Sequence, residues 1–185
     1  MAHKVFSSLR LVGGTALALQ LGHRKSIDLD FFGNIDFEKL NKTDTFKKYG
    51  QIKTLKSSQN INVLLINGIK VDFVHYTYPW LEEPITEEGI RIAGLKDIAA
   101  MKLAAITGRG SKKDFVDIYF LLKHFSLREL INEYNKKYFD GSEYMVLKSL
   151  TYFDDAEEDP IPEMSMDVSW EKVKSKMVSE VKQMV

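Results

Sequence analysis

Residues 11–32 read LVGGTALALQLGHRKSIDLDFF, a stretch that combines a strand, a glycine pair, a helix and a second strand. Its first apolar residues predict a short strand ending at Gly13 and Gly14, and residues 15–21 are strong helix formers that stop at Gly22. A strand that runs through glycines into a helix exposes backbone amides, which together with the helix dipole favour phosphate. A plain turn is the commoner explanation of an isolated glycine pair, so this signal needs support from other residues.

The second strand of this stretch carries Asp28 and Asp30, two residues apart. Side chains at this spacing on a strand share one face, and we expect Ile27 and Phe31 to pack on the other. Neighbouring carboxylates repel each other unless a cation lies between them, and Mg²⁺ binds a few carboxylate oxygens together with substrate phosphates. The alternative is a solvent-facing polar stripe. Because Phe31 and Phe32 are apolar on both faces, we expect a central strand and favour the metal.

Two apolar runs, 61–66 and 69–74, flank Asn67-Gly68, the dipeptide favoured in two-residue hairpin turns. Asp72 lies on the second of these runs. If this strand pairs with the first acidic strand, Asp72 supplies a third carboxylate, and three carboxylates can hold two Mg²⁺ ions for phosphoryl transfer. The alternative for Asp72 is an ion pair with Lys70 or a plain surface charge.

The second half of the chain has the periodicity of helices. Residues 77–88 are rich in proline and acid and predict a connector, after which the helical period begins at about residue 90. The expected helices are 36–49, 95–107, 112–124, 127–139, 143–153 and 170–184, with a weak strand at 51–56, N-caps at Ser126 and Ser169, and a solvated acidic loop at 154–159. We therefore expect an α+β protein with a mixed-sheet core over residues 1–90 and a helical half over residues 91–185 that closes the active site.

Lys102 interrupts the apolar face of the helix expected at 95–107. Asp114 and Asp117 lie three apart on the next helix and so share a side of it. Two interpretations account for these residues equally well. Either they form structural salt bridges between packed helices, or Lys102 binds phosphate and an aspartate orients the acceptor. The basic segment 23–25 likewise either contacts a triphosphate or forms a solvated loop.

The composition is that of an ordinary folded protein of 185 residues with no net charge, since Lys plus Arg and Asp plus Glu number 26 each. A polyanion-binding protein is usually basic, so we expect any contact with nucleic acid to be local. The absence of cysteine excludes disulfides and fits a reducing cytosol, and we expect a cytoplasmic location. No apolar run approaches the roughly 20 residues of a membrane span, so no membrane partner is expected.

The segments GGTALAL (13–19) and HRKSIDLDFF (23–32) closely resemble the AbiEii-type toxin nucleotidyltransferases of the DNA polymerase beta-like superfamily. A second block, LKDIAAMKLAA (95–105) and RGSKKDFVDIY (109–119), is also similar to that family. The resemblance implies the nucleotidyltransferase fold, an NTP substrate and Mg²⁺ or Mn²⁺. Family members include toxins of toxin–antitoxin and phage-defence systems, some of which add nucleotides to the acceptor end of tRNA.

The resemblance also assigns roles to positions of this chain. Gly13 and Gly14 match the phosphate-binding turn, and Lys102 matches the later catalytic lysine of the family. The candidate catalytic residues are Asp28, Asp30, Asp72, Lys102 and Asp114; the candidate nucleotide-binding residues are Gly13, Gly14, Thr15, Arg24, Ser26 and Lys102; the candidate metal ligands are Asp28, Asp30 and Asp72.

The expected function is Mg²⁺-dependent transfer of a nucleotide from an NTP to an acceptor such as tRNA, by a toxin-type or phage-defence enzyme that has a possible cognate antitoxin. The alternatives are transfer to a small molecule or a protein hydroxyl, and a catalytically silent module that binds nucleotide or protein. Only twelve residues precede Gly13, whereas family members usually carry a helical segment there; we take the chain as a short form or one whose start is missing.

Overall fold

The computed structural model describes residues 6–37 and 50–184, so most of the helix expected at 36–49 lies outside the described residues. The chain forms two compact units, each discontinuous in sequence, and the boundary between them falls within the first helix, after Ala16. Within the described residues, the sheet unit comprises 6–16, 26–37, 50–78 and 83–93, and the helical unit comprises 17–25, 79–82 and 94–184. The division into the continuous segments 1–90 and 91–185 stays a prediction.

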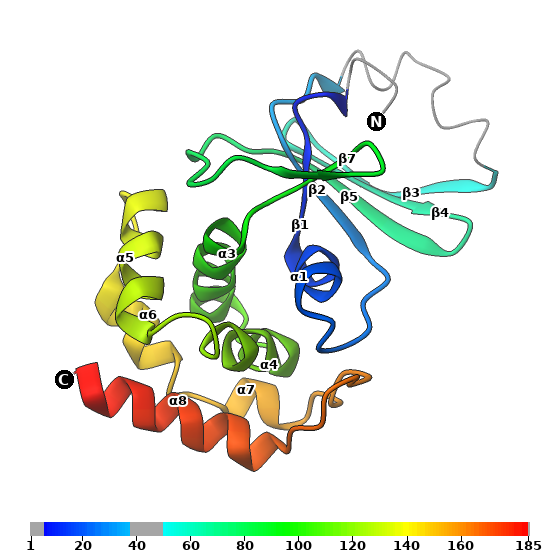
Figure 1. Cartoon of the computed structure of the whole chain (residues 1–185). Helices are drawn as coiled ribbons and strands as arrows, with labels where there is room; N and C mark the ends of the chain where they lie inside the picture. Colours follow the sequence, from blue (N-terminus) through cyan, green and yellow to red (C-terminus); the bar gives the residue numbers. More distant parts are fainter. Residues whose placement is uncertain (1–5, 38–49, 185) are drawn as a thin grey trace. The chain divides into compact units, whose positions relative to one another are not determined.

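The sheet unit contains one mixed sheet of seven strands among the described residues, in the order β3-β4-β5-β2-β1-β7-β6 (Figure 1). The strands are β1 (Arg10–Val12), β2 (Leu29–Gly33), β3 (Ile52–Ser57), β4 (Ile61–Ile66), β5 (Ile69–His75), β6 (Ile85–Glu87) and β7 (Ile90–Ile92). The central strand β2 pairs parallel with β5 and antiparallel with β1, and β1 pairs parallel with β7. The expected mixed sheet with a central acidic strand is therefore confirmed.

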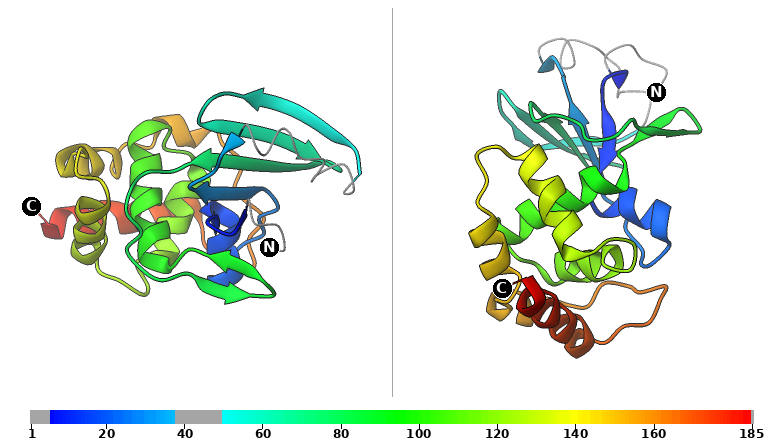
Figure 2. Two further views of the ribbon diagram at one scale, coloured as in Figure 1. Left: turned by 90° about the horizontal axis from the view of Figure 1, so that it is seen from above. Right: turned by 60° about the vertical axis from the view of Figure 1, so that its left-hand side comes forward.

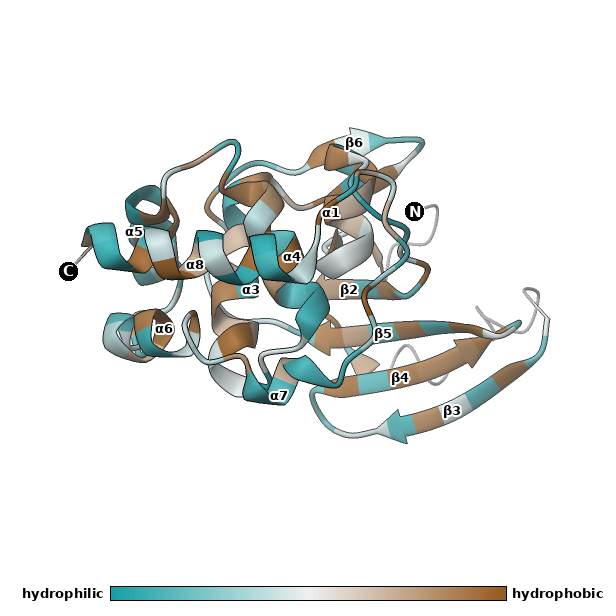
Figure 3. Cartoon of the chain, turned by 90° about the horizontal axis from the view of Figure 1, so that it is seen from below, coloured by the Kyte–Doolittle hydropathy of each residue, from teal (hydrophilic) through white to brown (hydrophobic). Residues whose placement is uncertain are grey.

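One face of β2 and β5 packs on the core of the sheet unit. Val71 and Phe73 are buried, and Phe31 stacks on Phe73 with ring centroids 5.7 Å apart. Apolar residues dominate β4, whereas β3 is mostly polar and exposed along its length (Figure 3). Because side chains alternate along a strand, burial of Val71 and Phe73 directs Asp72 to the opposite face of the sheet.

The described part of the sheet contains two hairpins with two-residue turns. Asn67 (φ 50°) and Gly68 (φ 84°) both have positive φ, which confirms the expected two-residue turn between β4 and β5. Glu88 (φ 49°) and Gly89 (φ 76°) repeat this geometry between β6 and β7. The expectations of a plain connector over 77–88 and of helical structure from residue 90 were wrong here, because strands of three residues are too short to show an alternating pattern.

The helical unit is built around α3, which packs against α4, α5 and α6, while α8 packs against α4 and α5 (Figure 2). Its helices are α3 (Leu95–Gly108), α4 (Lys112–Leu121), α5 (Leu127–Lys137), α6 (Glu143–Ser149), α7 (Asp154–Glu157) and α8 (Trp170–Met184). The residues described contain no helix long and apolar enough to cross a membrane.

Local signals fix several of the helix ends. Ser126 forms a capping box with Glu129 at the start of α5, and the Ser169 hydroxyl accepts from the Lys172 amide at the start of α8, so both expected N-caps are confirmed. Helix α1 (Gly13–Leu21) ends at Gly22, which has a φ of 63°. The expected acidic loop at 154–159 instead begins with the short helix α7, since Ala156 is buried and ties this turn to the core.

Candidate functional site

Asp30 and Asp72 lie side by side in the sheet unit. The parallel pairing of β2 with β5 sets Asp30 directly opposite Asp72, with Leu29 opposite Val71. Directly opposed residues of neighbouring strands point to the same face, so both carboxylates lie on the face that the core does not occupy. The strand begins at Leu29, and Asp28 therefore precedes it. The expectation that Ile27 packs on the other face was wrong, because its side chain is 72% exposed.

The Asp72 carboxylate has one satisfied and one unsatisfied oxygen. Its Oδ2 accepts from the Lys70 ammonium at 2.7 Å, which is the ion pair considered as the alternative explanation. Its Oδ1 is buried and has no hydrogen-bond partner among the described residues. A buried polar atom without a partner is costly unless a ligand or ion satisfies it. Oδ1 of Asp72 can therefore accept a hydrogen bond or bind a cation.

Gly13 lies against the Asp30 carboxylate. Its φ is 72°, and a Cβ built at this position would collide with Asp30 Oδ2. Only glycine combines this backbone conformation with so close an approach. The glycine pair forms the first residues of α1, so the start of that helix contacts the acidic strand. This contact brings the candidate phosphate-binding turn and a candidate metal ligand together within the sheet unit.

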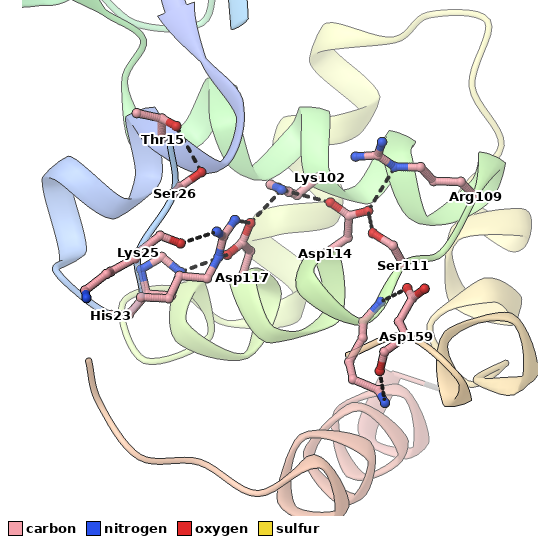
Figure 4. A network of polar contacts seen from close by, with 12 residues as sticks. Thr15, His23, Lys25, Ser26, Lys102, Arg109, Ser111, Asp114, Asp117 and Asp159 are labelled. Carbon is pink, nitrogen blue, oxygen red and sulfur yellow. Dashed lines mark hydrogen bonds and ion pairs between the residues drawn. The ribbon is translucent and has the colours of Figure 1, made fainter. Parts of the chain in front are cut away.

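Thr15 fixes the segment that leads into the acidic strand. Its hydroxyl lies 2.9 Å from the Ser26 hydroxyl (Figure 4). It also donates to the Asp28 carbonyl. Thr15 is buried, so these contacts anchor residues 26–28 to the start of α1. The structure thus brings together Thr15 and Ser26, both of which the sequence suggested as nucleotide-binding residues.

The described acidic residues of the sheet unit have the oxygen ligands that a divalent cation prefers, but the structure does not gather three of them around one point. Asp30 and Asp72 are adjacent, and Asp72 Oδ1 is unsatisfied, which suits a hard cation that prefers oxygen ligands. Within residues 6–37 and 50–184, no group of three or more His, Asp or Glu side chains is gathered closely enough to hold a metal ion. The role of Asp28 as a metal ligand stays a prediction.

Lys102 lies at the centre of a buried ion cluster in the helical unit, which we define as His23, Arg24, Lys102, Asp114 and Asp117 (Figure 4). Its Nζ lies 2.8 Å from Asp114 Oδ1 and 2.5 Å from Asp117 Oδ2. Both aspartates are fully buried and Lys102 is 6% exposed. The salt bridges of the structural interpretation are therefore present between α3 and α4.

Arg24 and His23 complete the buried ion cluster from a distant part of the sequence. Arg24 Nε and Nη2 donate to the two oxygens of Asp117 at 2.6 and 2.9 Å, and His23 Nε2 lies 2.8 Å from Asp117 Oδ1. The solvated-loop alternative was wrong for both residues, which are buried. Arg24 is thus bound to Asp117, and its expected contact with nucleotide stays a prediction. No local pattern in the sequence indicates this pairing, because Arg24 and Asp117 lie 93 residues apart.

The charges of this cluster stabilise one another. Burial by itself raises the pKa of Asp117, but the Lys102 charge and the hydrogen bonds from Arg24 and His23 outweigh it and hold that pKa well below its ordinary value. Burial also opposes the charged form of Lys102, yet the two carboxylates raise the pKa of its ammonium. The pKa of Asp114 is lowered, because Lys102 and the Ser111 hydroxyl overcome the effect of burial.

The two carboxylates of the buried ion cluster contact more cationic side chains than there are carboxylates. Asp114 also accepts from the Arg109 guanidinium at 3.2 Å, and the Arg109 side chain is 63% exposed. Two carboxylates therefore meet Lys102, Arg24 and Arg109. Asp114 and Asp117 each have a second cation besides Lys102, and the expected contact of Lys102 with phosphate stays a prediction.

Comparison with known proteins gives the family of the chain. The model of the nucleotidyl transferase AbiEii toxin family, type IV toxin–antitoxin system, matches residues 1–183. An uncharacterised protein of Aquifex aeolicus (strain VF5) is 41% identical over 179 residues, covering 94% of this chain and 86% of that protein.

Solved structures share the fold at low sequence identity. MenT4, a nucleotidyltransferase toxin of Mycobacterium tuberculosis, aligns with a TM-score of 0.62 at 14% identity over 98% of this chain and 78% of its own. JHP933 of Helicobacter pylori aligns with a TM-score of 0.58 at 20% identity over 95% of this chain and 83% of its own. The family match and the fold together confirm the resemblance seen in the sequence: the chain belongs to the AbiEii toxin family and is a nucleotidyltransferase.

Proposed function

We propose that this nucleotidyltransferase transfers a nucleotide from an NTP to an RNA acceptor such as tRNA, in a reaction that depends on Mg²⁺ or Mn²⁺. The observation that carries the proposal is the parallel register of β2 and β5, which sets Asp30 beside Asp72, whose Oδ1 is buried without a partner. Adjacent carboxylates with an unsatisfied oxygen attract a hard divalent cation, and nucleotidyl transfer is the chemistry that the family performs.

In this proposal the residues of the sheet unit hold the metal and the phosphates. Asp30 and Asp72 would be metal ligands, with Asp28 as the third. The bound metal would neutralise charge that develops on the phosphates during transfer. The amides of Gly13 and Gly14 at the start of α1 would bind phosphate oxygens, since the first amides of a helix have no partner within the helix.

Thr15 and Ser26 keep the glycine pair and the acidic strand in fixed positions, because their hydroxyls link the start of α1 to residues 26–28. Lys102 would supply a positive charge to the phosphates, and Asp114 would hold the lysine in place. The acceptor hydroxyl attacks the α-phosphorus and forms the new P–O bond. The bond from the α-phosphorus to the oxygen that bridges it to the β-phosphorus breaks, pyrophosphate leaves with the bonding electrons, and the proton of the acceptor hydroxyl passes to solvent.

The family description further suggests a biological setting. We propose that the activity is toxic or serves in phage defence in the cytoplasm, where NTPs and tRNA are found, and that a cognate antitoxin opposes it. Transfer to a small molecule or to a protein hydroxyl would use the same residues and differ only in the acceptor. A catalytically silent binding module would not need the acids on β2 and β5.

The test is to incubate the protein with each α-labelled NTP, with either total RNA or total protein, and with Mg²⁺, Mn²⁺ or EDTA. We expect label in RNA of tRNA size only when a divalent cation is present, and none with Asp30→Asn or Asp72→Asn. Asp167→Asn, which neutralises an exposed carboxylate in the helical unit, is the matched control and should be fully active. Labelled protein with unlabelled RNA would reject the RNA acceptor, and unchanged labelling in both variants would reject the metal site.

A further inference from the structure

The helical unit carries a groove between the end of α4 and the first half of α8. The α4–α8 groove has a volume of about 490 Å³ and is lined by Tyr119, Leu122, Lys123, Lys172, Ser175 and Lys176. Three of these six residues are lysines, and none is acidic. The chain as a whole has no net charge, so the groove is a local concentration of positive charge on a neutral protein.

Two of the three lysines are available to a ligand. In the described part of the chain, the exposed side chains of Lys123 and Lys172 have no carboxylate within ion-pair distance, whereas Lys176 is paired with Glu180 at 2.6 Å. Unpaired ammonium groups that line a hollow favour an anionic ligand.

The Lys123 ammonium is held in position by aromatic rings. Its Nζ lies 4.1 Å from the centroid of the Phe120 ring and 5.3 Å from that of Tyr119. Such cation–π contacts restrict a side chain that would otherwise be mobile. The Phe120 ring also contacts His23 of the buried ion cluster, with ring centroids 5.0 Å apart. The lysine is therefore connected through Phe120 and His23 to the part of the helical unit that contains Asp117.

The spacing of the lysines suits a chain of phosphates. Lys172 and Lys176 are four residues apart on α8, which places them about 6 Å apart along the helix axis. Lys123 faces the same groove from the end of α4. Several cations distributed along a groove can each contact a different phosphate of an extended polyanion, whereas a single small anion would need only one of them.

We propose that the α4–α8 groove binds the phosphate backbone of the RNA acceptor. This inference rests on the proposed function, which requires an RNA substrate, and adds the surface that holds it. Lys123 and Lys172 neutralise phosphates, and Lys176 contributes once its pair with Glu180 opens. The contact is to the backbone and therefore independent of base sequence.

The experiment measures binding of fluorescently labelled tRNA by anisotropy, without NTP or divalent cation, at several KCl concentrations. The variant is Lys123→Glu/Lys172→Glu, and Lys123→Gln/Lys172→Gln removes the charges without reversing them. Lys53→Glu/Lys148→Glu changes the same total charge at exposed lysines outside the groove. Both substituted groove positions are exposed, so the thermal unfolding of all variants should stay close to that of the wild type.

We expect the Gln variant to bind tRNA about tenfold more weakly. The negative slope of the logarithm of the association constant against log[KCl] should become less steep by about 1.4, since each of the two lost phosphate contacts contributes about 0.7 on a single strand. The Glu variant should bind still more weakly, and the control should bind like the wild type. Equal affinity in the wild type and the groove variants, or an equal loss in the control, would overturn the proposal. Displacement of tRNA by polyglutamate at equal charge would assign the groove to an acidic protein segment and would also overturn it.

This measurement separates the two proposals. If the wild type transfers no nucleotide to RNA but the groove variants lose tRNA binding, the proposed function is rejected and the α4–α8 groove is still an RNA-binding site. If Asp30→Asn abolishes transfer with tRNA binding intact while the groove variants bind tRNA like the wild type, RNA binding in the groove is rejected and the proposed function stands.

Discussion

The helical unit contains two buried lysine–aspartate arrangements that differ in how charge is shared. Lys137 Nζ lies 2.6 Å from Asp97 Oδ1 with both side chains fully buried, and it also donates to the Pro79 carbonyl at 2.8 Å. In the described part of the chain, Lys137 is the one cation that pairs with Asp97. In the buried ion cluster, by contrast, Lys102 pairs with two carboxylates that each have another cation.

The difference shows which lysine serves the scaffold. Asp97 also accepts from the amides of Leu81 and Glu82, at 3.0 and 3.1 Å, so the pair with Lys137 joins α3 and α5 to the segment 79–82. Every one of these contacts is internal to the fold. In the proposed function Lys102 would exchange a carboxylate for a phosphate, and Arg24 and Arg109 would remain with the acids. We therefore expect sharing of charge, rather than burial, to distinguish the proposed functional lysine, Lys102, from the structural one, Lys137.

The largest expected effect is on the structural pair. Lys137→Ala leaves the Asp97 carboxylate buried without a cation, which should lower the free energy of unfolding by about 3–5 kcal/mol in a urea titration. Lys136→Ala is the matched control, because the Lys136 side chain is 62% exposed and its pair with Glu133 should be worth less than about 1 kcal/mol. Similar losses in the two variants would show that the Lys137 pair has no special role in stability.

The second prediction concerns Lys102→Ala. Asp114 keeps Arg109 and Ser111, and Asp117 keeps its basic partners, so the loss in unfolding free energy should be smaller, about 1–3 kcal/mol. Nucleotide transfer should fall about 100-fold or more, as expected when a group that stabilises transition-state charge is removed. A loss of stability as large as for Lys137→Ala, with transfer retained in the folded fraction, would show that Lys102 has only a structural role.

The third prediction uses pH to test the charge sharing at Asp117. Because its folded-state pKa is lowered from the ordinary value of 3.8, its charge contributes stability that is fully present above that value and is lost as pH falls toward the folded pKa. The difference in unfolding free energy between wild type and Asp117→Asn should therefore be constant from about pH 5 to 7 and shrink below about pH 4. Urea titrations across this range measure it, and a difference that grows on acidification would contradict the shared-charge description.

The smallest effect is expected at the exposed edge of the cluster. Arg109→Ala removes a pair whose arginine side chain is 63% exposed, so unfolding free energy should change by less than about 1 kcal/mol. The double variant Lys102→Ala/Arg109→Ala should lose more stability than the sum of the single variants, because Asp114 then has no cation. Simple additivity would show that Arg109 does not compensate for Lys102.

The sequence predicted the central elements of the sheet because their signals are local. Asn67-Gly68 specified a hairpin, and the alternation along β5 and β2 gave the faces on which Asp30 and Asp72 lie. The short hairpin of β6 and β7 was missed, since three-residue strands show no period and only Glu88-Gly89 marked its turn.

The buried ion cluster was only partly predictable for a different reason. The spacing of Asp114 and Asp117 on one side of α4 is a local property, and it correctly associated both with Lys102. The contacts of His23 and Arg24 with Asp117 depend on how distant segments pack, which no local pattern encodes. A basic residue next to a histidine gave no indication that both are buried.

The central claim, that Asp30 and Asp72 bind the metal that holds the NTP, is tested most directly by calorimetry. An NTP analogue that cannot be cleaved between the α- and β-phosphates is titrated into wild type, Asp30→Asn, Asp72→Asn and the Asp167→Asn control, with Mg²⁺ or with EDTA. We predict that Mg²⁺ tightens binding in wild type and control by about tenfold or more and has no effect in the two sheet variants. Binding that is independent of metal and unchanged in both sheet variants would contradict the claim.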